Sequence, residues 1–356
     1  MLLSIPTISI EDALNENTFY IDVRSPKEFD EFHITGAINI PLFTNEERAK
    51  IGTTYKQISQ EKAIELGVEI LSKKLPDFYH KYKECAEMNK EKTIVVYCWR
   101  GGMRSRSIVS IMAAIGIPLF QLLNGIRSYR QLIAADLERL GSEEKPYIVL
   151  EGLTGTRKTD ILQALESEGY PVIDLERLAG HRGSTFGAIG LKPRSQKEFE
   201  KGLWERLSEL KEFPYYIIEA ESKRIGKVIL PDFILKGKDR GVRIHINASI
   251  ESRAKAICET YQFEKNFAET LEAMAVLKKR IPPTIVEYLY SELEKKNFSE
   301  FVRILLEEYY DPRYSYAANK LDTPVNYVYT DDLNDGINVV KAKINELVKY
   351  NGLLTI

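Results

Sequence analysis

The chain has 356 residues, of which 44% are hydrophobic and 29% are charged, and its formal net charge at pH 7 is −2. This length exceeds what a single hydrophobic core usually covers, so we expect two domains. No run of about eighteen apolar residues occurs, and the first residues lack the basic and apolar segments of a signal peptide, so we expect no membrane span and a cytoplasmic protein.

The first part of the chain contains two short apolar runs followed by helical patterns. Residues 19–23 and 93–97 predict buried strands, because each run is rich in β-branched and aromatic side chains. Apolar residues at helical spacing predict one helix after the loop that follows the second strand and another over 128–140. The polar stretch 141–146 has breakers at both ends. We place the domain boundary there, so that the first domain covers residues 1–140.

The second part of the chain alternates strands with helices on a larger scale. Strands are expected at 147–150, 171–174, 215–219, 242–246 and 325–329, and helices at 159–168, 195–211, 249–261 and 332–350. This alternation predicts a parallel sheet covered by helices on both faces. Residues 264–310 show helical patterns throughout. We therefore predict an α/β protein whose second domain, 141–356, carries a helical subdomain at about 264–310.

A cysteine directly follows the second strand and opens the run Cys98-Trp-Arg-Gly-Gly-Met-Arg104. A thiol is nucleophilic only as the thiolate, so a catalytic cysteine needs positive potential around it. The backbone amides of a strand–loop–helix turn and the N-terminus of the next helix supply that potential. Gly101 and Gly102 let the amides turn inward without a Cβ clash, and Arg104 is placed to bind an oxyanion through two contacts. We interpret Cys98 as a reactive thiol in an anion-binding loop.

A second loop follows the strand at 147–150 and reads Gly152-Leu-Thr-Gly155-Thr-Arg157-Lys158-Thr159. Its spacing almost matches the phosphate-binding loop, in which amides and a lysine bind phosphate oxygens and a hydroxyl helps to hold magnesium. Arg157 stands where a glycine belongs, so we expect either a distorted loop or a side chain that points outward. This departure favours diphosphate binding over nucleotide hydrolysis, and whether a nucleotide binds stays open.

Polar residues also follow the later strands of the second domain. Ligands of open parallel sheets bind beyond the carboxyl ends of the strands. Asp174 ends one of these strands, and His181 and Arg182 follow it in a glycine-flanked loop. No aspartate stands clearly as the usual magnesium partner, and Glu219 and Glu221 are the nearest candidates. We assign no certain metal ligand.

The segment from Asp22 to Pro41 contains Asp-Val-Arg-Ser-Pro-Lys-Glu-Phe and, later, His-Ile-Thr-Gly-Ala-Ile-Asn-Ile-Pro. Together with the cysteine loop, this segment resembles the rhodanese family. The resemblance implies a domain with a parallel sheet that carries sulfur or selenium on Cys98. The spacing Cys98-x5-Arg104 is one residue longer than the common sulfurtransferase loop and also resembles phosphatase loops. Sulfur transfer and phosphatase chemistry therefore both stay open for this domain.

Four further segments lie beyond the second loop, at 174–184, 186–187, 219–226 and 310–314. With the two loops, they resemble the tRNA 2-selenouridine synthase family, a rhodanese domain fused to a P-loop NTPase-like domain, over nearly the whole chain. The resemblance implies a transferase that replaces the sulfur of 2-thiouridine at the tRNA wobble position by selenium from selenophosphate. It also implies an S-geranyl-2-thiouridine intermediate made from geranyl diphosphate, hence a tRNA geranyltransferase activity.

The resemblance gives each group of residues a role. Cys98 would handle the selenium, and the loop around it would bind the selenium donor through Trp99, Arg100, Gly101, Gly102 and Arg104. The diphosphate would lie against Gly152, Gly155, Arg157, Lys158 and Thr159. The substrate pocket would draw on Asp174, His181, Arg182, Ser184, Glu219, Glu221 and Arg224. A magnesium ion would be an accessory to the second loop.

The residues themselves do not identify the partner. Basic groups suited to an RNA backbone occur at 223–224, 236–240 and 278–280, and tyrosines suited to base stacking at Tyr288, Tyr290, Tyr314 and Tyr316. Each of these is more simply a solvated face or a packed ring. The alternatives are a sulfurtransferase or phosphatase-like domain fused to a nucleotide-binding regulatory domain, and a tRNA-binding module without activity. A monomer is favoured.

Overall fold

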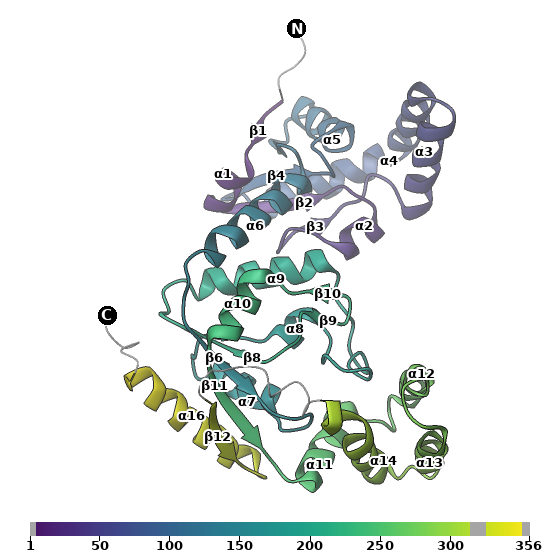
Figure 1. The fold of residues 1–356 in the computed structure, drawn as a ribbon. Coiled ribbons are helices and arrows are strands. Elements are labelled where there is room, and N and C mark those ends of the chain that lie inside the picture. The colour runs from purple at the N-terminus through teal and green to yellow at the C-terminus, as the bar shows by residue number, and fades with distance from the viewer. Residues whose placement is uncertain (1–4, 314–324, 351–356) are drawn as a thin grey trace. The chain divides into compact units, whose positions relative to one another are not determined.

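The computed structural model describes residues 5–313 and 325–350, and the chain divides into two compact units, Met1–Asp136 and Leu137–Ile356 (Figure 1). The division falls ahead of the polar stretch 141–146. Each unit is built on its own parallel sheet with helices around it, so the predicted α/β class is confirmed.

The first unit contains a parallel sheet of five strands in the order β1-β5-β4-β2-β3. The two predicted strands pair with each other, and Asp22 lies beside Tyr97 at their carboxyl ends. The strands are β1 (Thr7–Ile8), β2 (Thr18–Asp22), β3 (Ile38–Asn39), β4 (Thr93–Tyr97) and β5 (Phe120–Leu122). The helices are α1 (Ile10–Asn15), α2 (Pro26–Glu31), α3 (Asn45–Gln57), α4 (Gln60–Met88), α5 (Met103–Ala114) and α6 (Ile126–Gly141), whose last residues belong to the second unit.

Helices α3 and α4 stand out from the strand–helix alternation of this unit and lie against each other (Figure 1). Thr44 begins α3 with a capping box, in which its hydroxyl accepts from the Glu47 N–H and the Glu47 carboxylate accepts from the Thr44 N–H. Ser59 caps α4 by accepting from the Lys62 N–H at 3.1 Å. The sequence patterns above did not predict these two helices.

The second unit contains a parallel sheet in the order β12-β11-β6-β8-β7 and a short hairpin of β9 and β10. The chain leaves the central strand β6 to one side for β7 and β8 and to the other side for β11 and β12, which places the loop after β6 at a topological switch point. The strands are β6 (Tyr147–Glu151), β7 (Val172–Ile173), β8 (Tyr216–Glu219), β9 (Arg224–Ile225), β10 (Val228–Ile229), β11 (Val242–Asn247) and β12 (Val325–Tyr329). The helices that accompany this sheet are α7 (Lys158–Ser167), α8 (Leu175–Ala179), α9 (Gln196–Glu209), α10 (Asp232–Arg240), α11 (Ile250–Tyr261) and α16 (Leu333–Tyr350).

A group of helices follows α11 and has a hydrophobic core of its own. It consists of α12 (Phe267–Leu277), α13 (Pro283–Glu294), α14 (Phe298–Leu305) and the π-helix η1 (Leu306–Tyr310), drawn in green to yellow in Figure 1. Phe301 is fully buried in this core, and Phe186 reaches it from the loop after α8. Over the described parts of the chain, no helix combines the length and apolar character needed to cross a bilayer.

Candidate active sites

Cys98 lies at the carboxyl end of β4 with its side chain buried. The Ser105 hydroxyl donates to its Sγ at 3.2 Å, and the Ile126 N–H donates to its carbonyl oxygen at 2.9 Å. The loop then turns into α5, whose first turn contains Arg104 and Ser105. The N-terminus of α5 therefore faces the loop, as an anion-binding turn requires.

Two glycines are necessary for the path of this loop. Gly101 has φ +63°, and a Cβ there would lie 2.9 Å from the Leu122 carbonyl oxygen. Gly125 has φ +57°, and a Cβ there would collide with the Cys98 carbonyl oxygen. Gly102 differs from our expectation, because its φ is −91° and a Cβ would meet no atom within 4 Å. The structure thus requires Gly101, as expected, shows no such need at Gly102, and adds Gly125, which the sequence marks only as part of a turn.

Gln121 of β5 braces the loop from the neighbouring strand. Its amide nitrogen donates to the Gly101 carbonyl at 2.8 Å and to the Ser105 hydroxyl at 2.9 Å. The hydroxyl of Ser105 is thereby aimed at the sulfur. Sequence reasoning missed both residues, because Gln121 comes from a strand too short to show a pattern.

Arg104 is held by a carboxylate of the same unit. Its Nη1 lies 2.8 Å from Oε2 of Glu28, and Nε of Arg48 lies 3.6 Å from the same oxygen. Burial would raise the pKa of Glu28, but the hydrogen bond and charge of Arg104 outweigh burial and lower it. Arg104 is therefore fixed beside the loop by Glu28, while Trp99 and Arg100 are exposed.

The loop after β6 forms the turn expected of a phosphate-binding loop. Gly152 has φ +149°, and a Cβ there would collide with the Ile246 carbonyl oxygen. Gly155 has φ +87°, and a Cβ there would lie 2.7 Å from the Arg253 carbonyl oxygen. Both glycines are therefore required by close approach of neighbouring backbone.

Arg157 occupies the left-handed region, with φ 58° and ψ 26°, at the N-cap of α7. Its backbone thus takes a conformation that glycine adopts at lower cost. Its guanidinium turns to α11, where Nη2 lies 2.5 Å from Oε2 of Glu259, and also lies 3.4 Å from Asp160. Of the two expected outcomes, the structure has the outward-pointing side chain.

The Lys158 side chain hydrogen-bonds to the backbone of its own loop. Its Nζ donates to the carbonyl oxygens of Gly152 at 2.8 Å and Leu153 at 3.1 Å. Arg253 of α11 fastens the loop from outside, because its Nε donates to the Thr154 carbonyl at 2.8 Å. Burial lowers the pKa of Lys158, and Glu176, Glu221 and Glu219 oppose that shift.

A carboxylate cluster faces Lys158 from the ends of β7 and β8. Thr159 Oγ1 donates to Oε2 of Glu176 at 3.1 Å, and the Glu176 N–H donates to Oε1 of Glu219 at 2.8 Å. Burial raises the pKa of Glu176 to about 8, with Glu221 acting in the same direction. Burial also raises the pKa of Glu219, whose Oε2 is buried without a hydrogen-bond partner. Sequence reasoning missed Glu176, although it stands two residues after Asp174.

The cluster offers oxygens of the kind that magnesium prefers, from Thr159, Glu176 and the unpartnered Oε2 of Glu219. Within residues 5–313 and 325–350, however, no three histidine, cysteine or acidic side chains converge as a metal-binding group. An ion held by Thr159, Glu176 and Glu219 would take the rest of its coordination from water and from the oxygens of a phosphate ligand.

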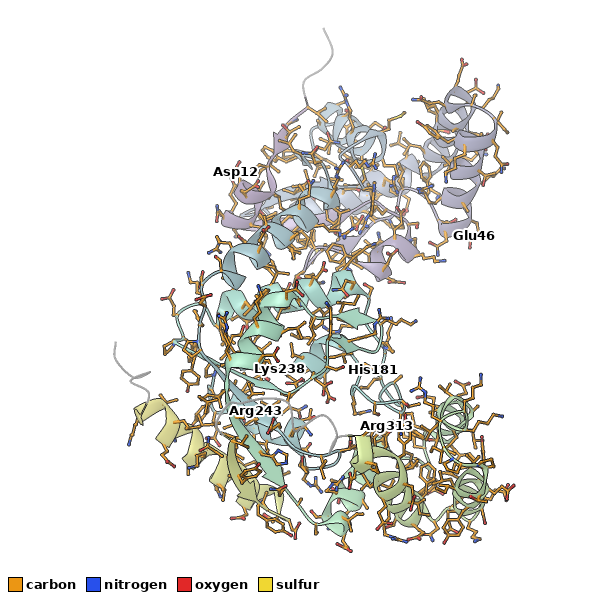
Figure 2. The ribbon with its side chains drawn as sticks, viewed as in Figure 1. Asp12, Glu46, His181, Lys238, Arg243 and Arg313 are labelled. Carbon is orange, nitrogen blue, oxygen red and sulfur yellow. The ribbon has the colours of Figure 1, made fainter. Side chains whose placement is uncertain are left out.

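The remaining pocket candidates do not all face the phosphate loop. Asp174 is buried and caps α8 by accepting from the Arg177 N–H. His181 packs against Gly187 and Gly226, where added Cβ atoms would lie 2.7 Å from its ring (labelled in Figure 2). Burial lowers the pKa of His181, and its Nδ1 is buried without a hydrogen-bond partner.

Arg182 and Ser184 contact the helical part of the second unit. The Arg182 guanidinium stacks on the Tyr261 ring at 5.0 Å, and the Ser184 hydroxyl lies 3.3 Å from the Tyr261 hydroxyl. Arg224 is exposed on β9. Glu221 adjoins Gly183 and accepts at its carbonyl from Lys238, which is labelled in Figure 2. The structure therefore groups Glu219 and Glu221 with Lys158 and places Arg182, Ser184 and Arg224 elsewhere.

Two family models match this chain. The model for the tRNA 2-selenouridine synthase AAA domain matches residues 145–346, and the model for the rhodanese-like domain matches residues 9–132. The first match alone covers more than half of the sequence. The chain belongs to the tRNA 2-selenouridine synthase family.

Named members of the family resemble it over much of its length. A tRNA 2-selenouridine synthase of Nitrosomonas europaea is 34% identical over 270 residues, which cover 72% of this chain and 67% of that protein. One of Chromohalobacter salexigens is 31% identical over 346 residues, which cover 89% and 92%. A crystallised N-terminal domain from Clostridium difficile 630 is 41% identical and covers 36% of this chain and 98% of its own, with a TM-score of 0.34.

The basic residues and tyrosines that suit RNA binding differ in how exposed they are in this protein. Lys278, Lys279 and Arg280 are exposed between α12 and α13. Tyr288 is also exposed, whereas Tyr290 packs against the helical core. Tyr314 and Tyr316 lie outside the described residues.

Proposed function

We propose that this protein is a transferase that modifies tRNA by replacing the sulfur of a 2-thiouridine with selenium. The observation that carries this proposal is the family membership of the whole chain, with both domains matched. Relatives of 34% and 31% identity bear the name tRNA 2-selenouridine synthase. The Cys98 loop and the phosphate loop support an active enzyme, while its action on tRNA and its place in the cytoplasm are proposed from the family membership.

The phosphate loop is proposed to bind geranyl diphosphate. The thiouridine sulfur attacks C1 of the geranyl group, an S–C bond forms, the C–O bond breaks, and diphosphate leaves. Lys158 sits against the loop carbonyls of Gly152 and Leu153, from which it is able to turn towards an incoming phosphate. Positive groups fixed at the leaving oxygens stabilise the charge that develops there.

A magnesium ion fits this first step as an accessory. Thr159, Glu176 and Glu219 would hold it together with the diphosphate. The ion would neutralise charge on the leaving diphosphate. Arg157 is proposed to act outside the cradle, because its guanidinium is engaged by Glu259 and Asp160.

The cysteine loop is proposed to deliver selenium from selenophosphate to the alkylated base. The selenium of selenophosphate attacks C2 of the base, a C–Se bond forms, the C–S bond breaks, and geranyl thiolate leaves. Water then attacks the phosphorus, the P–Se bond breaks, and phosphate is released. The amide-rich turn before α5 and the side chain of Arg104 suit the phosphate of the donor. Cys98 lies at the centre of this turn, where its thiol takes part in the transfer of selenium from the donor.

The test is mass spectrometry of tRNA carrying wobble 2-thiouridine after incubation with the purified enzyme, selenophosphate and geranyl diphosphate. Omitting selenophosphate is expected to stop the reaction at S-geranyl-2-thiouridine. Omitting geranyl diphosphate is expected to leave the thiouridine unchanged. Selenouridine formed at full rate without geranyl diphosphate would refute the alkylated intermediate, and no change of the tRNA under any condition would refute the proposed function.

A further inference from the structure

A cavity of about 320 Å³ lies in the first unit between α3, α4 and the first turns of α5. Its walls are mainly apolar and include Ile51 and Tyr55 of α3, Ile64, Val68 and Leu71 of α4, and Met103 of α5. A volume of this size falls in the range of small-molecule sites, about 300–1,000 Å³. We call this cavity the α3–α4 groove.

The two helices leave much apolar surface uncovered along this groove. Helix α3 has no buried residue at all, although Ile51 and Tyr55 belong to it. Tyr55 is 57% exposed, Val68 60% and Met103 55%. Contiguous exposed apolar surface of this kind marks binding sites in soluble proteins.

Two glycines line the groove. Gly52 in α3 and Gly67 in α4 both stand inside helices, where glycine is less stable than alanine. Neither has a positive φ, so neither is needed for the path of the backbone. A Cβ at Gly52 would lie 2.7 Å from Nη1 of Arg48, whereas a Cβ at Gly67 would lie 3.5 Å from Phe43, an ordinary contact distance. Gly67 is therefore the glycine whose missing side chain leaves space in the groove.

The groove continues into the turn that carries the reactive thiol. Met103, Arg104 and Ser107 of α5 form one wall of it. Ser105, between them in sequence, donates its hydroxyl hydrogen bond to Cys98. A group bound in the groove would therefore contact the helix turn whose Ser105 donates to the Cys98 sulfur.

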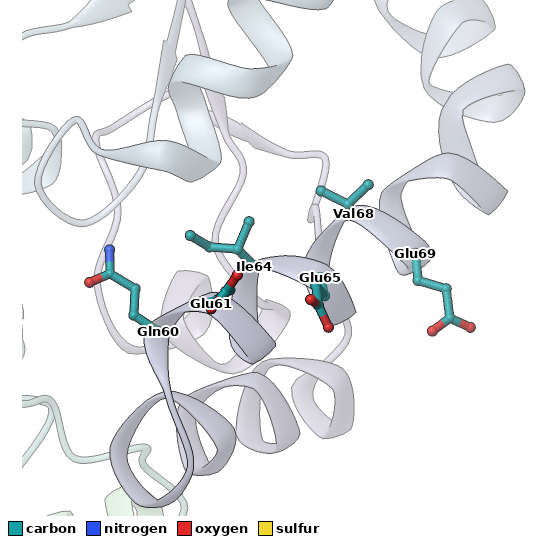
Figure 3. Close-up of a pocket in the computed structure, with 6 residues that line it drawn as sticks. All are labelled: Gln60, Glu61, Ile64, Glu65, Val68 and Glu69. Carbon is teal, nitrogen blue, oxygen red and sulfur yellow. The ribbon is translucent and has the colours of Figure 1, made fainter.

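A second, open hollow lies along α4 and is lined by Gln60, Glu61, Ile64, Glu65, Val68 and Glu69 (Figure 3). Ile64 and Val68 line both hollows, so their apolar strip continues beyond the α3–α4 groove. The carboxylates of Glu65 and Glu69 are paired with Lys62 and Lys73, and the groove itself is also lined by Arg48, Lys56 and Arg104. The apolar strip therefore suits a hydrocarbon chain, and the cations beside it suit the phosphates of the tRNA that carries the chain.

We propose that the α3–α4 groove binds the ten-carbon hydrocarbon chain of S-geranyl-2-thiouridine while its base is presented to the Cys98 loop. The inference rests on the proposed function and adds a binding site for the leaving group to it. Burial of the chain holds the alkylated tRNA at the cysteine loop through contacts that unmodified thiouridine does not make.

The test uses the full-length enzyme and two tRNA substrates, one with S-geranyl-2-thiouridine and one with S-methyl-2-thiouridine, each with selenophosphate. Gly67→Leu fills the groove and replaces a helix glycine by a good helix former. We expect this substitution to raise the ratio of the KM for the geranyl substrate to the KM for the methyl substrate roughly 50-fold. A change of this size corresponds to about three methylene groups of the geranyl chain that are no longer buried. Val68→Glu, at an exposed position, is expected to act in the same direction.

Ser72→Leu is the matched control, because Ser72 is exposed on α4 and lies outside both hollows. It is expected to leave the ratio of the two KM values at the wild-type level. A wild-type ratio in both Gly67→Leu and Val68→Glu overturns the groove assignment, as does an equal loss with the two substrates. If the wild-type enzyme converts neither substrate to selenouridine, the proposed function itself fails, which is a distinct result.

Discussion

The Arg157 guanidinium reaches Glu259 of α11, with Nη2 2.5 Å from Oε2, while the Arg157 backbone keeps the left-handed conformation of a glycine. The Arg157 side chain therefore points away from the phosphate loop, and the backbone turn of that loop is retained. The ion pair is partly exposed, and such pairs contribute little stability.

Replacing Arg157 separates these two effects. Arg157→Gly loses the ion pair but relieves the positive φ, so we expect its free energy of unfolding to change by less than about 1 kcal/mol. Arg157→Ala loses the ion pair and keeps a Cβ at positive φ, so it is expected to be about 1 kcal/mol less stable than Arg157→Gly. Urea unfolding of the second unit measures both. Equal stability of the two variants would show that the left-handed backbone carries no cost here.

Lys158→Ala is expected to lower the rate of geranylation about 100-fold or more, because it removes a positive group from the leaving diphosphate. The same variant is expected to convert tRNA that already carries S-geranyl-2-thiouridine at the wild-type rate. Lys343→Ala, on α16, is the control for loss of a lysine. Chromatography of digested tRNA follows both steps, and normal geranylation by Lys158→Ala would remove the diphosphate role.

Cys98→Ala is expected to abolish selenium insertion and to leave geranylation and tRNA binding intact. Ser105→Ala tests the hydrogen bond to the sulfur, whose loss we expect to lower kcat for selenium insertion about tenfold. Ser110→Ala, further along the same helix, is the control. Single-turnover assays with S-geranyl tRNA measure the effect. Full activity of Ser105→Ala would mean that the hydroxyl only packs beside Cys98.

Arg24 and Asp22 form a buried ion pair of 2.6 Å in the first unit, and Arg24 also donates to the Phe32 carbonyl at 2.5 Å. Arg24→Met leaves the Asp22 carboxylate buried without its partner, so we expect a loss of about 3–5 kcal/mol in the free energy of unfolding. The double variant Asp22→Leu/Arg24→Met is expected to be more stable than Arg24→Met alone. Thermal unfolding of the three proteins decides whether this pair serves the fold.

The raised pKa of Glu176, about 8, predicts how diphosphate binding depends on pH. Below pH 8 the side chain is neutral, and above pH 8 it places a negative charge beside Lys158 and the bound anion. We therefore expect wild-type affinity for inorganic diphosphate, measured without divalent ions, to fall about tenfold relative to Glu176→Gln as pH rises from 7 to 9. The ratio of the two proteins cancels the ionisation of the ligand itself. A ratio that stays constant with pH would contradict a titrating Glu176.

Local patterns were sufficient for several parts of this protein. The strands at 93–97 and 325–329 lie where the sequence placed them. Both phosphate-type loops follow buried strands and lead into helices, because glycine spacing and apolar runs act within a few residues of each other. The two-residue strand β7 also falls within the strand expected at 171–174, whereas β1 and β3 gave no periodic signal of this kind and depend on their neighbours for pairing.

The sequence by itself determined the α/β class, the two glycine-containing loops between a strand and a helix, and the place of Cys98 directly after β4. The tertiary structure decided what surrounds them. Gln121, Glu28 and Glu176 reach the loops from other elements, and the outward turn of Arg157 depends on Glu259, about a hundred residues away. These contacts join residues distant in sequence, so no local pattern specifies them, and they exist only after the sheets and helices have packed.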